Sequence, residues 1–349
     1  MALLDNTLLQ EARVALDLVN RGEFMHAIQK DTTNYGILKA GVENSPLLVP
    51  GYDINREKMA TSQTVKIPYY DRIANGSATA RGNTATLEGV SQLQTVTTSG
   101  FREEVKLSDL QNYENDINRM EHFAFLMMSK TRNLKDRIET YLQTQLDAAR
   151  SQETTNLYTF PAEFAWDGVT DFEYTVDLAN QDNYWRHVRA MAMRNMIGST
   201  YNVVASPELD FNLSYIANQG QGNSTNIAYS VAGLNDFQWS NAITNAAGER
   251  SNAYVYRPGA FGVQFWTNKL HANGRSNGYQ NWGLMQDPDF GFNIEVYTES
   301  GQEDTSGTIS GGQLDYTESI VMYAEVSFVG QPADALSKTD IYKIAQLTS

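Results

Sequence analysis

The sequence predicts an α+β fold with two packed lobes, and three observations support this prediction. Apolar and polar residues alternate over 61–71 and 90–109, which is the period of strands with one covered face. A helical pattern continues without a break over 116–150, and from 166 to 317 the chain changes to short strands with Gly and Asn turns. A chain of 349 residues favours two cores over one.

The first 50 residues are predicted to form an N-terminal arm (1–50). Residues 7–30 have apolar side chains at helical spacing, but the stretch that follows is interrupted by two glycines and two prolines: Gly36, Gly41, Pro46 and Pro50. Both residue types disfavour the interior of a helix. We therefore expect this stretch to lie over another part of the assembly.

A long hairpin is predicted over 64–109. Its first strand contains Pro68, which cannot donate a hydrogen bond, so this is an edge strand or the end of a strand. The segment between the strands reads RIANGSATARGNTATLEG (72–89), in which only Ile73 and Leu87 could contribute to a core. Such a segment buries too little apolar surface to offset the entropy of ordering its own backbone. Its composition alone leaves its role open.

Residues 116–150 predict one long helix. Apolar side chains recur every three or four residues from Met120 to Leu146, Asp116 is a suitable N-cap, and Arg150 suits the C-terminal end. At about 1.5 Å per residue the helix would be roughly 50 Å long, the length of a spine on which other elements lean. A local basic cluster on it is either a solvated face or a contact for DNA or a scaffold: Lys130, Arg132, Lys135 and Arg137.

The region 166–317 predicts a mixed domain. A helix over 184–198, ended by Gly198, runs into a short buried strand over 199–209. Later strands are expected at 253–256, 261–267 and 292–298, followed by a polar loop over 299–313. The run 319–330 alternates clearly and predicts a final strand.

Composition excludes several classes of protein. With 26 Lys and Arg against 41 Asp and Glu, the net charge is -15, whereas a sequence-specific DNA reader normally has a basic stripe. The charge remains compatible with an acidic protein layer that encloses nucleic acid. The absence of cysteine excludes disulfides, thiolate zinc sites and a cysteine nucleophile. No secretory signal and no membrane-length apolar run is evident, so we expect a soluble protein made in a cytoplasm.

Chemical motifs are sparse. No Walker loop, nucleophile elbow or paired-histidine metal motif occurs, and the four histidines are scattered, so we expect no catalytic residue, no cofactor and no metal site. The segment 287–291 resembles the start of a calcium loop, but its glycine comes one residue early, which favours a turn. The acidic residues that follow could alternatively gather a divalent ion. The aromatic residues of 166–300 would suit a sugar surface, although core and subunit contacts are favoured.

Taken in order, these pieces resemble a known family. The segments that carry the resemblance are TVKIPYYDRIANG, RNMIGSTYNVVASP and MYAEVSFVGQPADAL. Their order resembles the major capsid protein of tailed bacteriophages, the Hong Kong 97-like coat fold that encapsulins also use. The resemblance covers nearly the whole chain and lies in architecture more than in invariant residues.

The resemblance implies a division of the chain. It places the N-terminal arm at 1–50, an extended loop at 64–109, an axial domain at 166–317 and a peripheral domain, with the spine helix, at 51–63, 110–165 and 318–349. It implies that the extended loop reaches over a neighbouring subunit, which would supply the apolar partners that 72–89 lacks. The interface residues would then be Arg72, Asn75, Gly76, Arg81, Gly82, Asn83, Leu87 and Glu88. The tip of the axial domain would contain Glu299, Glu303 and Asp304.

The resemblance also implies a function. It predicts pentamers and hexamers that form an icosahedral shell around double-stranded DNA, bound non-specifically, with a portal protein, a separate scaffolding protein and a possible decoration protein as partners. The protein would be located in the virion after assembly in the host cytoplasm, with no membrane partner and no enzymatic activity. Because no lysine lies between Lys66 and Lys106, a covalent cross-link through a lysine of the extended loop is not expected. The alternatives are an encapsulin-like compartment and, from another class, a carbohydrate-binding or carbohydrate-active protein.

Overall fold

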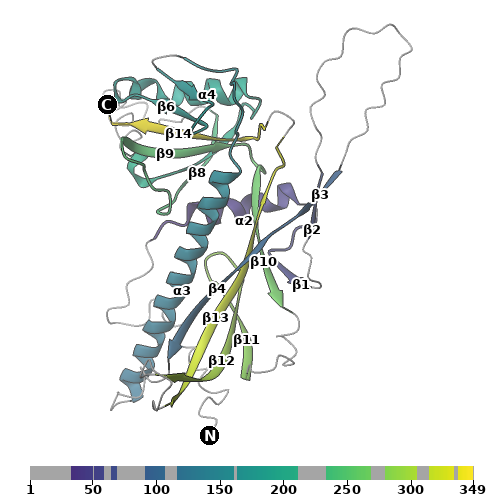
Figure 1. Cartoon of the computed structure of the whole chain (residues 1–349), viewed down its shortest axis with the longest axis vertical. Helices are drawn as coiled ribbons and strands as arrows, with labels where there is room; N and C mark the ends of the chain where they lie inside the picture. Colours follow the sequence, from purple (N-terminus) through teal and green to yellow (C-terminus); the bar gives the residue numbers. More distant parts are fainter. Residues whose placement is uncertain are drawn as a thin grey trace, which may run out of the picture.

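The structure is a computed structural model that describes residues 33–49, 51–58, 64–68, 91–106, 116–160, 163–210, 233–268, 280–304, 314–333 and 337–348. Two six-stranded sheets form two lobes, and a long helix runs beside one of them (Figure 1). The predicted α+β class is therefore confirmed. The larger hydrophobic cluster includes residues of both sheets, with Val204, Tyr254 and Tyr256 contributed by the second sheet. A further cluster lies within the second lobe.

The first sheet is built around one long strand, β13 (Leu314–Gly330). Along one edge β13 pairs with β12 (Asn293–Asp304) and then with β10 (Phe261–Asn268), and along its other edge it pairs with β4 (Thr98–Lys106), all antiparallel. The remaining strands are β11 (Gln280–Gln286), which pairs with β12, and β1 (Asn55–Lys58), which pairs in parallel with β10.

The spine helix α3 (Asp116–Ala148) packs on β4 and β13. Its apolar stripe is the one the sequence predicts, and the buried members are Phe123, Met127, Leu134, Ile138, Leu142 and Leu146. At about 1.5 Å per residue its 33 residues span roughly 50 Å, so it runs along the sheet as a rigid edge (Figure 1).

The second sheet has the order β5-β6-β14-β9-β7-β8. Its strands are β5 (Ala165–Asp167), β6 (Glu173–Val176), β7 (Tyr201–Ala205), β8 (Leu234–Trp239), β9 (Glu249–Tyr256) and β14 (Ile341–Leu347). The helix α4 (Tyr184–Arg194) packs its buried face into the same core, and short 3₁₀ helices lie at Leu178–Asn183 and Pro207–Leu209. The helix ends at Arg194, four residues before the predicted Gly198.

The division into two sheets differs from the predicted domain boundaries. Residues 261–304 lie within the predicted axial domain, yet β10, β11 and β12 belong to the first sheet beside the spine helix. Conversely, β14 comes from the predicted peripheral segment and lies between β6 and β9 in the second sheet. A single boundary at 317 does not separate the two sheets, because strands that are distant in sequence complete each of them.

Residues 36–48 correct the prediction of a broken arm. They form the helix α2 (Gly36–Leu48), which lies between the two lobes (Figure 1) and packs on β10. Its glycines allow close approach, since a Cβ on Gly41 would lie 2.3 Å from Val263 Cγ2. Pro46 stands within the helix, and Ser45 Oγ donates to the Gly41 carbonyl. Tertiary packing therefore overrides the local signals against a helix.

Candidate functional site

The predicted hairpin forms at its base. Strands β2 (Thr64–Pro68) and β3 (Ser91–Thr95) pair antiparallel over five positions, from Thr64 opposite Thr95 to Pro68 opposite Ser91. They make a two-stranded sheet of their own, joined by hydrogen bonds to neither large sheet among the described residues. The eight predicted interface residues between 72 and 88 lie outside the described residues.

A small apolar cluster fixes this hairpin to the body. Its buried members are Leu48, Val49, Ile67, Val96, Trp266 and Val329. Trp266 Nε1 also donates to Ser327 Oγ at 2.7 Å, which holds the ring in place between β10 and β13. The cluster joins the end of α2, the hairpin and the first sheet, so the base of the hairpin is anchored beside the body (Figure 1).

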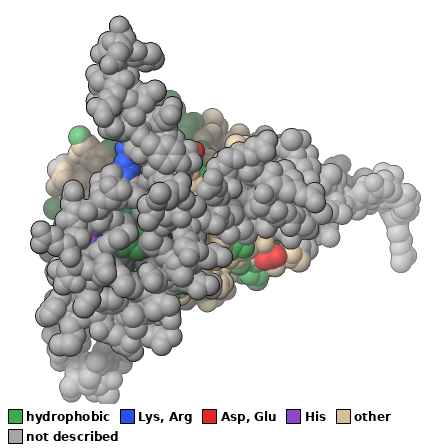
Figure 2. Space-filling view, turned by 90° about the horizontal axis from the view of Figure 1, so that it is seen from below, with side chains coloured by type: hydrophobic (Ala, Val, Ile, Leu, Met, Phe, Trp, Pro, Cys, Tyr) green, Lys and Arg blue, Asp and Glu red, His purple; other side chains and the backbone are tan. Residues whose placement is uncertain are grey.

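The four predicted basic residues do not form one surface. Lys130 and Arg137 both reach Glu103 on β4, at 3.5 and 2.9 Å. Arg132 donates to Thr33 Oγ1, whereas Lys135 is buried and contacts Asp289 at 2.9 Å. The described basic and acidic side chains visible in Figure 2 also lie apart from one another. A contact of this cluster with DNA or a scaffold stays a prediction that these pairings do not favour.

The three predicted tip residues lie on a strand. Glu299, Glu303 and Asp304 belong to β12, so the first six residues of the predicted loop over 299–313 form a strand. Glu299 Oε2 accepts a 2.5 Å hydrogen bond from Arg102 Nη2 of β4, across β13. These residues thus belong to the sheet beside the spine helix and not to the second sheet. The reason is that the β12–β13 pairing continues to Asp304, six residues beyond the predicted end of the strand at 298.

A buried carboxylate joins the two lobes. Glu139 on α3 is 2% exposed, and its two oxygens accept hydrogen bonds from Ile37 N and Leu38 N, each at 2.8 Å. Ser240, directly after β8, donates to Glu139 Oε1 at 2.6 Å. The first-turn N–H groups of α2 have no partner within their own helix, and α2 has no side-chain cap of its own. Glu139 therefore caps α2 from more than a hundred residues away and ties it to the second sheet.

Burial governs the protonation of this group. Desolvation raises the pKa of Glu139 from 4.5 to about 7, although the bonds from Ser240, Ile37 and Leu38 oppose the shift and Asp136 adds to it. The sequence analysis missed this residue. Its only signal was an acidic side chain directly after Ile138 in the apolar stripe.

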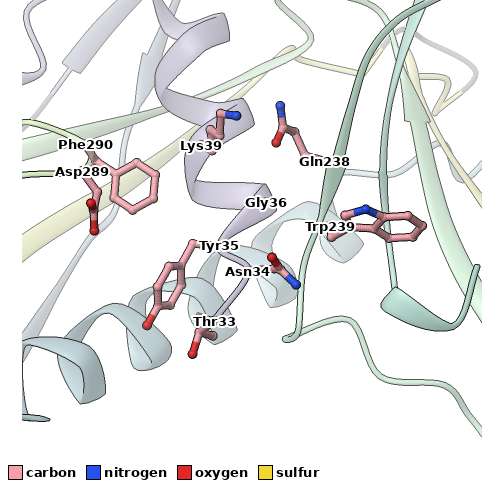
Figure 3. A pocket seen from close by; sticks show the side chains of 9 residues that line it. All are labelled: Thr33, Asn34, Tyr35, Gly36, Lys39, Gln238, Trp239, Asp289 and Phe290. Carbon is pink, nitrogen blue, oxygen red and sulfur yellow. The ribbon is translucent and has the colours of Figure 1, made fainter. Parts of the chain in front are cut away.

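A pocket opens beside this joint. It has a volume of about 280 Å³ and is lined by Thr33, Asn34, Tyr35, Gly36, Lys39, Gln238, Trp239, Asp289 and Phe290. Figure 3 shows Lys39 and Gln238 together at one rim, with Asp289 and Phe290 on one side and Trp239 on the other. The pocket therefore lies where α2, β8 and the β11–β12 turn meet.

The second lobe exposes large apolar side chains. Five such residues lie between 157 and 196: Leu157, Phe160, Val169, Met193 and Met196. Tyr174 Oη donates to the carbonyl of Tyr158 and accepts from Asn195 Nδ2, so the loop at 157–160 and the end of α4 lie near one another. These exposed side chains are available for contact with another protein.

His187 and the turn at 287–291 are the two described sites at which the sequence raised a question of catalysis or metal binding. His187 Nδ1 and Tyr158 Oη lie 2.8 Å apart, and its Nε2 lies 3.2 Å from Glu163, within a cluster of aromatic rings that supports the predicted structural role. The segment 287–291 is a turn, as predicted, with Gly291 N donating to the Asp287 carbonyl. Within the described part of the chain, no three His, Asp or Glu side chains are placed to hold a metal ion. No helix there is long and apolar enough to cross a membrane.

Similarity to known proteins was found among solved structures. No family model and no curated protein matches the chain. Among solved structures, a chain from Mycobacterium phage Adephagia is 11% identical with a TM-score of 0.48, covering 95% of this chain and 97% of its own.

Two further structures are described as capsids. A chain of the capsid asymmetric unit of cyanophage A-1(L) is 9% identical with a TM-score of 0.48, covering 93% of this chain and 96% of its own. A chain from the phage G structure of major capsid proteins and decoration proteins is 10% identical with a TM-score of 0.38, covering 93% of both chains. These values describe the similarity of the backbone folds and assign no function to any residue. The protein is similar, along nearly its whole length, to chains from phage capsid structures.

Proposed function

We propose that this protein is the major capsid protein of a tailed bacteriophage. Its copies assemble into pentamers and hexamers that close an icosahedral shell around double-stranded DNA. The observation that carries the proposal is the β2–β3 hairpin, a two-stranded sheet that pairs with neither large sheet among the described residues and is held to the body by one small apolar cluster (Figure 1). A two-stranded sheet is at best marginally stable by itself in water, so the hairpin is expected to gain further contacts from another chain.

The body of the molecule supports the same proposal. A helix of 33 residues beside a sheet centred on a 17-residue strand gives a stiff, elongated subunit. The exposed apolar side chains of the second lobe offer a further contact with neighbouring copies. Several contacts per subunit would bury more than the roughly 1,600 Å² of a standard interface. Modest pairwise energies then add up to a stable shell through multivalency.

Partners and location follow from this role. A shell that fills with DNA needs a portal protein, and a separate scaffolding protein and a decoration protein are proposed as further partners. The DNA is held without sequence specificity, in keeping with the net charge of -15. The protein is then located in the virion and assembled in the host cytoplasm, and its role is structural and not enzymatic.

The test is expression of the chain alone, followed by size-exclusion chromatography and electron microscopy. Closed shells, capsomer rings or tubes are expected. In a second variant, residues 72–89 are replaced by a short Gly-Ser turn, and closed shells should be lost while circular dichroism and the melting temperature of the body stay unchanged. A variant with a Gly-Ser segment of the original length separates the effect of the side chains from the effect of loop length.

The outcomes separate the alternatives. Shells that enclose enzymes and no DNA would favour an encapsulin-like compartment. A monomer near 39.0 kDa, even with a scaffolding protein added, would contradict a shell role, and sugar affinity of that monomer would favour the carbohydrate-binding alternative.

A further inference from the structure

The helix α4 forms the outer layer of the second lobe. Neighbouring residues of β9 enter different hydrophobic clusters, since Ala253 and Val255 pack with α4, whereas Tyr254 and Tyr256 belong to the cluster that contains the spine helix. The second sheet therefore lies between α4 and the spine helix, and Figure 1 shows α4 on the far side of that lobe. One face of α4 covers the sheet, and the opposite face is exposed.

The exposed face of α4 is a stripe of arginines around a methionine, called the arginine stripe below. Its members are Arg186, Arg189, Ala190, Met193 and Arg194, of which Ala190 is half-buried and the others are exposed. At 3.6 residues per turn, these positions lie within an arc of about 140°. Their spacing is the one that helices normally use to bury an apolar face. The stripe therefore has the form of a contact surface, although it is basic.

The charges of the arginine stripe are unfavourable within the chain itself. Helix α4 contains no Asp or Glu, and none of the three arginines forms a salt bridge with a carboxylate of the described residues. Arg186 donates one long hydrogen bond, of 3.4 Å, to Asn183 Oδ1. It also lies in the first turn, where the helix dipole disfavours a cation, and three residues from the like charge of Arg189. By contrast, two basic side chains of the spine helix both reach Glu103. The charges of the stripe are better satisfied by a partner of opposite charge.

An exposed aromatic ring lies beside α4. Phe160 is 50% exposed, and its ring centre lies 5.4 Å from that of His187 on α4 and 5.5 Å from that of Tyr158. Its N–H group donates to the Phe164 carbonyl and its carbonyl accepts from Phe164 N, each at 2.7 Å. The ring is therefore held in place while half of the residue stays exposed. Aromatic residues, arginine and methionine are the side chains enriched at protein interfaces.

We propose that the arginine stripe, with Phe160 beside it, binds an acidic amphipathic helix of another protein. Guanidinium groups bind carboxylates through two parallel hydrogen bonds, and Met193 and Phe160 would contact apolar side chains of the same helix. The net charge of -15 repels an acidic partner from most of the chain, so the stripe also determines where the partner binds. Leu157 and Val169 lie on other segments and stay available for contacts between copies.

A nucleic acid fits this face less well. The affinity of a protein for nucleic acid rises with the number of phosphates that its basic residues neutralise. The arginine stripe supplies three cations with apolar side chains between them, on a chain whose net charge repels a polyanion. A protein helix with both carboxylates and apolar side chains matches both parts of the stripe. The inference does not depend on the proposed shell function.

The test is fluorescence anisotropy with two synthetic amphipathic peptides of about 18 residues, which is long enough for an isolated helix. One peptide has a leucine stripe flanked by glutamates, and the other has lysines in place of the glutamates. The full-length protein is expected to bind the first peptide and not the second. Raising the salt concentration from about 50 to about 150 mM should weaken this binding several-fold, because the charges are exposed. Equal affinity for both peptides, or no binding of the acidic peptide, contradicts the proposal.

Arg186→Glu separates a binding role from a structural one. It places an acidic residue in the first turn of α4, so the melting temperature should stay unchanged or rise, whereas the affinity for the acidic peptide should fall about tenfold or more. Arg257→Glu makes the same change of charge at an exposed arginine of the second lobe outside α4, and it should bind the peptide as wild type does.

Two further measurements exclude other occupants of the arginine stripe. A short DNA duplex that binds more tightly than the acidic peptide, and that Arg186→Glu no longer binds, would assign the stripe to nucleic acid. Self-association of the wild type that Arg186→Glu abolishes, measured by sedimentation velocity, would assign it to a second copy of this chain. Either result contradicts the proposal. The melting temperature of each variant verifies that it is folded.

Discussion

Glu139 shows how a single buried residue can decide the relation between two lobes. Its carboxylate receives two N–H groups of α2 and the hydroxyl group of Ser240 next to β8. Each hydrogen bond to a charged group contributes about 1.5–3 kcal/mol, but removing the charge from water costs several kcal/mol. The raised pKa indicates that the cost of desolvation is the larger of the two effects.

The stability of the protein should therefore depend on this group between about pH 4.5 and about pH 7. Because its pKa is higher in the folded state, its stabilising contribution is complete below the lower value and is lost as the pH rises through the higher one. We expect the free energy of unfolding of wild type, relative to Glu139→Gln, to fall on the order of 3 kcal/mol across this range. Urea unfolding of both proteins at several pH values measures this difference. A difference that stays constant would mean that Glu139 remains ionised in the folded state.

Gly36 tests how closely α2 approaches the second sheet. A Cβ at this position would lie 2.2 Å from the carbonyl oxygen of Trp239, and this backbone cannot easily move because Tyr35 forms a β-bridge with Ser240. Gly36→Ala gains up to about 1 kcal/mol in helix propensity, but the clash should outweigh it. We expect a net loss of about 1–3 kcal/mol in urea unfolding.

Gly283 is the matched control for this substitution. A Cβ at Gly283 would meet no atom within 4 Å, and this glycine has no positive φ angle. Gly283→Ala should therefore leave the free energy of unfolding unchanged or slightly higher. If both substitutions change the free energy of unfolding equally, the clash with Trp239 does not determine the effect of Gly36→Ala.

At the scale of elements, the spine helix α3 and the helix α2 are stabilised in different ways. The helix α3 is stable because its own stripe of apolar residues covers β4 and β13. The helix α2 contains Gly36, Gly41 and Pro46 and has no local cap, so it depends on Glu139 and on contacts with β10. One helix is specified by its own sequence and the other by its neighbours.

Substitutions in α3 should lower the free energy of unfolding only where they change its buried face. Leu134 is fully buried in the first core, so Leu134→Ala should lower the free energy of unfolding by about 2–5 kcal/mol. Asn133→Ala, on the adjacent exposed position, should change it by less than about 0.7 kcal/mol. Chemical denaturation followed by circular dichroism compares the two. Similar losses for both variants would contradict the packing described for α3.

At the scale of the whole molecule, the net charge of -15 opposes assembly. Copies of one acidic chain repel each other over a distance of about 30 Å at 10 mM salt but only about 8 Å at 150 mM. If the proposed shell forms, its critical concentration should fall when the salt concentration rises over this range. Light scattering against protein concentration measures it. A critical concentration that rises with salt would indicate that opposite charges hold the subunits together.

The sequence by itself determined those elements whose patterns are local. The stripe of α3, the alternation of β13 and the pairing of β2 with β3 could be predicted because each pattern repeats over many residues of one continuous segment. The turn at 287–291 was also predicted, since its backbone hydrogen bonds involve near neighbours only.

Only the tertiary structure decided which segments meet. It placed β14 in the second sheet and residues 261–304 in the first, gave α2 its distant cap, and moved Glu299 from a predicted loop into β12. It also separated the basic residues of α3, pairing Lys130 and Arg137 with Glu103 and burying Lys135 against Asp289. The physical reason is the same in each case: these contacts join residues about 20 or more positions apart, and their energy appears in no local pattern of the chain.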